Sequence, residues 1–474
     1  MSPNAPSVND LTQLARLDAI AQAELCARGE VSQAELWAHC LERVAFLNPL
    51  LRAVVTHAAA SSAGRHEGLL AGVPFLMKDS SPWPGLRWTL GARLFGKRVT
   101  LQQTEFGRRL EEAGLVCAGK TALSEFGLLA STETLLEGAT LNPWNLALSP
   151  LGSSGGSAVA VAAGLVPLAH ANDGGGSIRA PASACGVFGF KPSRGRTAVA
   201  NRSGSEFANM TSDHCLTRTV RDSALFLSLT EDRSLAAPVG FVSEPSARRL
   251  RIGAWTTTMV GEAPEPAVLR AHDQVCALLR ALGHHVELIA APEYEMPALN
   301  DAYYSIAGAA VANVVETIDR TREEPVQRGE LEPFTWALVD ALGECAGDPV
   351  SDSLAVFARA VSTYNEVTRP FDVILTPTVG VESVPLGDLS PVLPRRTLLE
   401  RAARVLGYTP LHNIVGCPAM SVPLHWSEAG LPVGAHFAAA PGQDALLLAL
   451  AYELERAQPW HDRWPPYSIP VLLG

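Results

Sequence analysis

Residues 149–197 read SPLGSSGGSAVAVAAGLVPLAHANDGGGSIRAPASACGVFGFKPSRGRT. Glycine and serine gather there in two clusters, Gly152–Ser157 and Gly174–Ser177, and the residues between them predict a short helix followed by a strand. Glycine adopts positive φ without strain and lets the backbone approach a ligand, and successive N–H groups can converge on an anion. For either cluster taken alone, a plain tight turn explains the glycines as well as a binding loop does. At this point the stretch leaves a binding loop and a plain turn both open.

Three familiar site patterns are absent from the sequence. No GxxxxGK[ST] occurs, and no GxGxxG opens a helix with an acidic residue about twenty positions later, which argues against a nucleotide loop. The GxSxG turn of a Ser-His-Asp hydrolase is missing from both clusters, and nothing ties His170 or His214 to a serine. The 12 histidines include no HExxH, so no metal site is expected.

Apolar runs and helical stretches alternate on both sides of the two clusters. Runs at 73–77, 115–118 and 166–169 are separated by helical segments such as 104–113. Further on, strands are expected at 250–255, 285–289, 373–376, 420–423 and 433–437, with a helix at 264–283. This rhythm is typical of an α/β sheet.

Two helices are expected ahead of the sheet. The first has an apolar face over 11–28 with Asp10 as its N-cap, and the second begins with a capping box of Ser32 and Glu35. Asn48-Pro49 is expected to end the second helix. The stretch 231–246 has proline, glycine and little periodicity, which predicts a linker between two parts of the protein.

Composition excludes several classes of protein. The 474 residues carry 37 Lys+Arg against 48 Asp+Glu, a net charge of −11, so no nucleic-acid or anionic-membrane partner is expected. The longest apolar run, 158–169, falls short of the ~20 residues that a membrane helix needs. The N-terminus lacks the pattern of a secretory signal, and the 8 cysteines form no CxxC pair. We therefore expect a cytoplasmic protein without disulfides.

Motifs along most of the chain resemble the amidase signature family. They are GVPFLMKD (72–79), GKTALSEFG (119–127), NPWN (142–145), GSSGGS (152–157), DGGGSIR (173–179), PASACG (181–186), KPSRGR (191–196), VILTPT (373–378) and GCPAMSVPLHWSEAGLPVG (416–434). Within the family, the wording around NPWN and HANDGGGSIRAPAS is most similar to bacterial amidases that hydrolyse nylon-type cyclic dimers.

This resemblance implies a single large α/β domain over residues 1–474, with a mixed twisted β-sheet that helices cover on both faces. Its parts would be helices in 1–67, a signature core in 68–230, and a C-terminal part in 247–474 that completes the sheet and the substrate pocket. The implied activity is cofactor-free hydrolysis of the C–N bond of a small, apolar amide, with an ester or carbamate as further substrates. A homodimer is one option for its assembly.

The resemblance also implies a Ser–cis-Ser–Lys triad, in which Ser177 is the nucleophile. The residue types support this role, because Ser177 follows three glycines. The N–H groups of Gly174, Gly175 and Gly176, with its own, would hold an oxyanion.

Lys78 is the expected base of that triad. It follows the apolar run VPFLM, where desolvation favours the neutral amine. Ser153 would relay the proton between Lys78 and Ser177, and we expect a cis Gly152–Ser153 peptide bond so that its side chain faces both. Taken by itself, Lys78 beside Asp79 would read as a surface ion pair, and both serine clusters together favour catalysis.

Supporting roles fall to neighbouring residues. Asp173 and Arg179 would anchor the loop through hydrogen bonds or an ion pair. Ser154 either bonds within the site or packs in the turn. Gly127 and Leu128 would border the substrate pocket, where the apolar Leu128 puts a cyclic amide in doubt.

The sequence departs from the usual family pattern at Leu151, Asn172 and Gly174. The third consecutive glycine would leave more room for a bulky acyl group. Two other functions remain open. In the glutaminase subunit of a tRNA-dependent amidotransferase, Gln typically follows SIR, where this chain has Ala180. A noncatalytic binding protein of the same fold is disfavoured by the intact Lys78 and serines.

Overall fold

One mixed sheet of eleven strands runs through the protein, in the order β1-β3-β2-β6-β8-β7-β12-β13-β11-β9-β10. The computed structural model describes residues 11–58, 66–198, 204–232, 234, 237–345 and 347–474. The strands of the sheet are β1 (Val54–His57), β2 (Pro74–Lys78), β3 (Val116–Thr121), β6 (Leu168–Asp173), β7 (Phe188–Lys191), β8 (Ser212–Thr217), β9 (Arg251–Ala254), β10 (His285–Leu288), β11 (Val373–Pro377), β12 (Ala419–Trp426) and β13 (Pro432–Ala439). A separate pair is formed by β4 (Glu133–Thr134) and β5 (Gly138–Ala139).

Helices surround this sheet. They are α1 (Leu11–Arg16), α2 (Ala19–Ala27), α3 (Gln33–Leu51), α4 (Glu105–Glu112), α5 (Gly155–Ala162), α6 (Arg179–Cys185), α7 (Glu206–Asn209), α8 (Val220–Thr230), α9 (Pro266–Ala281), α10 (Met296–Asp319), α11 (Pro333–Gly343), α12 (Pro349–Thr368), α13 (Arg395–Val405), α14 (Thr409–Val415), α15 (Asp444–Ala457) and α16 (Ile469–Leu472). Short 3-10 turns lie at Arg93–Phe95, Glu125–Gly127 and Arg328–Glu330.

Alternating side chains of the strands show that helices cover both faces of the sheet. On β2, Leu76 packs into a core cluster with residues of α3 and α5, whereas Phe75 and Met77 pack with residues of α4 and α8. Successive side chains of a strand point to opposite faces. The predicted α/β fold, with a mixed sheet between helical layers, is therefore confirmed.

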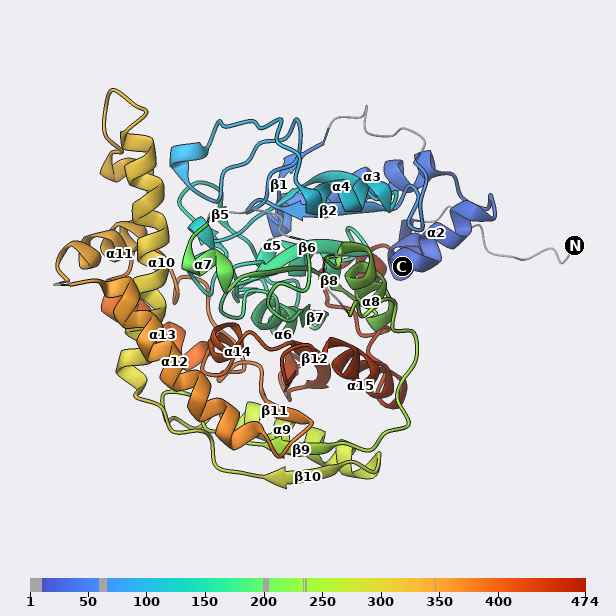
Figure 1. Ribbon diagram of the computed structural model, residues 1–474. Coiled ribbons are helices and arrows are strands. Elements are labelled where there is room, and N and C mark those ends of the chain that lie inside the picture. The colour runs from blue at the N-terminus through green and yellow to red at the C-terminus, as the bar shows by residue number, and fades with distance from the viewer. Residues whose placement is uncertain (1–10, 59–65, 199–203, 233, 235–236, 346) are drawn as a thin grey trace, which may run out of the picture.

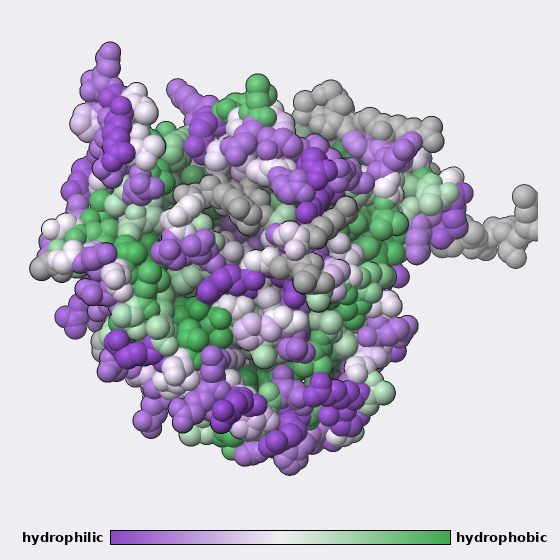
Figure 2. All heavy atoms as spheres, in the orientation of Figure 1, coloured by the Kyte–Doolittle hydropathy of each residue, from purple (hydrophilic) through white to green (hydrophobic). Residues whose placement is uncertain are grey.

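Figure 1 shows how the elements are arranged around the sheet, which runs from β1 near the top to β10 at the bottom. Helices α10–α13 stand together at the left of this view, away from the N-terminal helices at the right. Figure 2 shows hydrophilic side chains over much of the same face, with apolar groups between them beside the helices at the left. Among the described residues, no helix has the length and apolar character needed to cross a membrane.

The strands downstream of the proposed linker continue the same sheet. The predicted strands at 250–255, 285–289 and 373–376 correspond to β9, β10 and β11, and β11 joins the rest through β13. The predicted helix at 264–283 is α9. The described residues of 231–246 form only irregular structure between α8 and β9.

The N-terminal helices differ from the prediction in two places. The expected single helix over 11–28 is broken, because Asp18 accepts a hydrogen bond from the Ala21 N–H and starts α2 as its N-cap. Asp10 lies outside the described residues. The capping box of Ser32 and Glu35 is confirmed, but α3 continues through Pro49 and ends at Arg52 in the left-handed conformation.

Candidate active site

Three parallel strands bring the predicted site residues to one edge of the sheet. β2 pairs in parallel with β3 on one side and with β6 on the other. Lys78 is the last residue of β2, Asp173 is the last residue of β6, and the turn that contains Gly127 follows β3. The carboxyl ends of neighbouring parallel strands lie at the same edge, so residues far apart in the sequence meet there.

Lys78 is fully buried and does not form a surface ion pair. Its Nζ lies 2.7 Å from Ser153 Oγ, 2.8 Å from Ser154 Oγ and 2.6 Å from Asn172 Oδ1. The neighbouring Asp79 instead forms a buried ion pair with Lys120 at 3.0 Å. Lys78 is therefore directed at the serine turn.

Burial lowers the pKa of Lys78 from 10.5 to about 7. The carboxylates of Asp173 and Asp213 act in the opposite direction and do not offset the loss of hydration. A substantial fraction of this lysine is then the neutral amine near pH 7, which is the form that a base requires.

The turn before α5 places Ser153 beside Lys78. The Gly152–Ser153 peptide bond is cis, as predicted. A Cβ on Gly152 would lie 2.1 Å from the carbonyl oxygen of Ser131, so only glycine fits the position. A Cβ on Gly127 would lie 3.2 Å from Ser153 Oγ, which places the backbone of Gly127 next to Ser153.

The two glycine clusters meet through a backbone hydrogen bond, in which the Ser154 N–H donates to the Ser177 carbonyl at 3.3 Å. Ser177 is partly exposed, unlike Lys78 and Ser153. Its hydroxyl makes no hydrogen bond to another residue that the structure describes. The Lys78–Ser153 hydrogen bond is thus formed, whereas no hydrogen bond joins the Ser153 and Ser177 hydroxyls among the described residues.

The backbone of the nucleophile loop offers fewer free donors than expected. The Gly176 N–H donates to Asp173 Oδ1 at 2.7 Å, so the prediction that Gly176 holds an oxyanion is wrong for this geometry. Within the described ranges, the N–H groups of Gly174, Gly175 and Ser177 have no acceptor. These three donors remain available to a ligand.

Asp173 and Arg179 anchor this loop as an ion pair that is wholly buried. Arg179 Nε and Nη2 donate to the two carboxylate oxygens of Asp173, both at 2.9 Å. Burial by itself would raise the pKa of Asp173, but the guanidinium beside it holds that pKa well below its usual range. Asp173 also accepts the N–H of Ile178 at 3.1 Å, so the carboxylate shapes the turn around Ser177.

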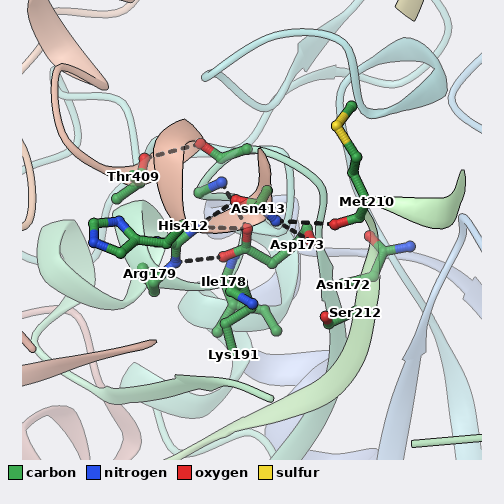
Figure 3. A network of polar contacts seen from close by, with 12 residues as sticks. Asn172, Asp173, Ile178, Arg179, Lys191, Met210, Ser212, Thr409, His412 and Asn413 are labelled. Carbon is green, nitrogen blue, oxygen red and sulfur yellow. Dashed lines mark hydrogen bonds and ion pairs between the residues drawn. The ribbon is translucent and has the colours of Figure 1, made fainter. Parts of the chain in front are cut away.

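Two side chains of α14 complete the loop, and sequence reasoning missed both. Asn413 Nδ2 donates to the Asp173 carbonyl at 2.7 Å, and its Oδ1 accepts from Arg179 at 2.6 Å. Thr409 Oγ1 donates to the Gly175 carbonyl at 2.8 Å. Figure 3 shows both side chains reaching the loop from the short helix. Their spacing of one helical turn was the one available signal, and it has meaning only once a helix is known there.

These contacts orient the free donors of the loop. In a trans peptide the C=O and N–H point in opposite directions. Because Asn413 holds the Asp173 carbonyl, the N–H of Gly174 points away from α14. The Gly176 carbonyl accepts the Ala180 N–H at 2.8 Å, so the N–H of Ser177 points away from the body of α6.

On each of the three glycines, the position that a Cβ atom would take is occupied by neighbouring protein atoms. A Cβ on Gly174 would lie 2.9 Å from Thr211 Oγ1. A Cβ on Gly175 would lie 2.2 Å from the Tyr303 hydroxyl, and a Cβ on Gly176 would lie 2.2 Å from Thr409 Oγ1. Glycine at position 174 therefore accommodates packed side chains, and the expectation that it leaves room for a bulky acyl group stays a prediction.

The apolar residues near the site lie both before and after the two glycine clusters in the sequence. Leu128 is buried in a core cluster with Ala180 and with residues of α10, α11 and α13. Phe207 and Tyr303 pack edge to face, with ring centroids 6.0 Å apart, beside the glycine loop. The structure thus places Leu128 in the core and Gly127 against Ser153.

Arg179→Met is expected to destabilise the protein by about 3–5 kcal/mol, because it leaves the Asp173 carboxylate buried without its partner. Denaturant unfolding monitored by fluorescence would measure this loss. The matched control is Arg328→Met, which breaks an ion pair with Asp340 at the surface and should change stability far less. Equal effects of the two variants would contradict the anchoring role of Arg179.

Comparisons with known proteins agree with this geometry. A family model described as Amidase matches residues 23–448. A Mycobacterium bovis protein named AmiC is 36% identical, covering 94% of this chain and 96% of its own length. The 6-aminohexanoate-cyclic-dimer hydrolase of Pseudomonas sp. is 34% identical, with coverage of 96% and 97%.

The solved structures include a similar fold. The structure of 6-aminohexanoate cyclic dimer hydrolase complexed with substrate superposes with a TM-score of 0.88 and 32% identity. That match covers 96% of this chain and 99% of the other. The chain therefore belongs to the amidase family of hydrolases, which act on carbon–nitrogen bonds.

Proposed function

We propose that this protein hydrolyses small, apolar amides through a covalent acyl-enzyme, with Ser177 as nucleophile, Ser153 as proton relay and Lys78 as base. The observation that carries the proposal is the position of the buried Lys78 amine, 2.7 Å from Ser153, at a pKa of about 7. A general base is most effective when its pKa lies near the working pH.

The first half of the reaction forms the acyl-enzyme. Ser177 Oγ attacks the carbonyl carbon of the amide and gives its proton to Ser153, which passes its own proton to the neutral Lys78. The carbonyl oxygen becomes an oxyanion, and the free N–H groups of Gly174, Gly175 and Ser177 are placed to bind it.

The relay then runs in reverse and releases the amine. Protonated Lys78 returns a proton to Ser153, and Ser153 gives one to the amide nitrogen as the C–N bond breaks. Protonation matters because an unprotonated amide nitrogen is a poor leaving group. A water molecule next attacks the Ser177 ester and loses its proton along the same path. The acid leaves, and the Ser177 hydroxyl is restored.

The aromatic and aliphatic groups near the loop support an apolar substrate. Phe207 lies beside Gly174, and Tyr303 lies beside Gly175. An uncharged acyl group would lose little hydration on entering such surroundings.

Active-site labelling combined with a substrate panel tests the proposal. The purified chain is treated with a fluorophosphonate and analysed by peptide mass spectrometry, then offered an anilide, an ester and a carbamate with and without glutamine. We expect labelling at Ser177 and release of aniline that glutamine does not change. Turnover of glutamine alone would favour the glutaminase subunit, and a chain that is neither labelled nor active would favour a binding protein.

A further inference from the structure

Asn172 supplies one of the three groups that surround the Lys78 amine and forms a hydrogen bond with a second, Ser154. Its side-chain Oδ1 lies 2.6 Å from Nζ, and its main-chain carbonyl accepts a hydrogen bond from Ser154 Oγ at 3.2 Å. Its Nδ2 donates to Ser80 Oγ at 3.1 Å, which fixes the amide with the oxygen facing Lys78. The residue departs from the usual family pattern, and the proposed reaction assigns it no part.

The hydrogen-bonding capacity of each partner decides where the protons of Lys78 lie. Asn172 Oδ1 is a carbonyl oxygen and can only accept. The Ser154 hydroxyl has a single proton, which it donates to the Asn172 carbonyl, so towards Lys78 its oxygen acts as an acceptor. Ser153 is the one partner of Nζ whose hydroxyl proton is not engaged elsewhere within the described residues.

A neutral lysine amine has two N–H donors and one lone pair. Asn172 and Ser154 take the two N–H groups, because neither can give a proton to Nζ. The lone pair is then left facing Ser153 Oγ at 2.7 Å. We propose that Asn172 is a positioning residue, which directs the lone pair of Lys78 at the Ser153 hydroxyl and so selects the direction of proton transfer. This inference rests on the function proposed above.

Two substitutions at Asn172 should change catalysis in opposite ways. Asn172→Leu removes the side-chain acceptor, so the amine can rotate and kcat at the plateau of the pH profile should fall by about 10- to 100-fold, part of the ~10²–10⁴ that acid–base catalysis supplies. Asn172→Asp keeps an acceptor and adds a negative charge, which favours protonated Lys78. In this variant the rise of kcat with pH should occur about 1 pH unit or more higher than in the wild type, while kcat at the plateau is largely retained.

Other titratable groups stand around this lysine and remain unchanged in both variants: Asp79, Lys120, His170, Asp173 and Asp213. A shift of the limb between variants therefore reports the change at Asn172. Asn48→Asp is the matched control, since among the described residues the Asn48 side chain bonds only to backbone groups of Ala53 and Val54, between α3 and β1. Its pH profile should match the wild type.

The test measures kcat and KM for an anilide from pH 5 to 10, together with the rate of fluorophosphonate inactivation, which reports activation of Ser177 without turnover. The kcat values are divided by the fraction of protein molecules that the fluorophosphonate labels. The expected result is a lower plateau for the leucine variant and a displaced limb for the aspartate variant, with KM nearly constant. Should Asn172→Leu fail to fold, the limb of Asn172→Asp still decides the matter.

If both variants keep the pH profile and the plateau of the wild type, the proposed role of Asn172 is wrong. Labelling of Ser177 and amide turnover in the wild type would still support the proposed function. A wild-type protein without labelling or turnover would instead remove the proposed function itself.

Discussion

Ser177→Ala is expected to lower kcat/KM for an amide by at least ~10³-fold, because the attacking oxygen is lost and only the oxyanion donors and binding contacts remain. The fold should survive, since the Ser177 hydroxyl makes no hydrogen bond to another described residue. Steady-state kinetics and thermal unfolding of the same preparation would measure both outcomes.

Ser228→Ala is a suitable control for this variant. Ser228 lies on α8, and within the described part of the chain its hydroxyl donates only to the Leu225 carbonyl of the same helix, so its loss should leave turnover unchanged. If Ser177→Ala keeps more than about a tenth of the wild-type rate, another group is the nucleophile.

Lys78→Ala is expected to abolish the rising limb of the pH profile along with most of the activity. In the wild type, burial brings the pKa of Lys78 to about 7, so at lower pH the amine is protonated and cannot accept a proton. Activity should therefore rise about tenfold per pH unit below pH 7 and level off above it. A plot of log kcat/KM against pH would show the limb directly.

Lys78→Met separates chemistry from packing in this experiment, because methionine fills much of the space of the lysine stem without the amine. Both variants should lose the limb, and methionine should retain more stability. A pH profile that keeps its limb near pH 7 in either variant would show that another group is the base.

The part of the site that lies on strands could be predicted from the sequence. Lys78 ends the apolar run that forms β2, and the second cluster, Gly174–Ser177, comes directly after β6. Apolar runs of this length predict buried strands, and dense glycine predicts special turns. The assignment of Lys78, Ser153 and Ser177 as a triad rests on the resemblance of many motifs and stays a proposal, because the family match shows the family alone.

The part that depends on contacts across the fold could not be predicted. Whether the Gly176 N–H is free depends on the rotamer of Asp173, and the rotamer depends on Arg179 and on Asn413 from a helix more than two hundred residues away. The break between α1 and α2 also depends on a contact between residues that are far apart in the sequence. Asp18 can cap a helix or lie within one, and its bond to Arg221 of α8 favours the cap.

The proposed triad and α14 are far apart in the sequence, and this separation has a consequence for the synthesis of the protein on the ribosome. Lys78, Ser153 and Ser177 are synthesised in the first half of the chain, whereas Thr409 and Asn413 emerge near its end. Until then the Asp173 carbonyl lacks its donor Asn413, and the Arg179 guanidinium has Asp173 as a partner but not Asn413. A nascent or truncated chain that already carries the whole triad is therefore expected to be inert, and hydrolytic activity should begin only when synthesis is almost complete.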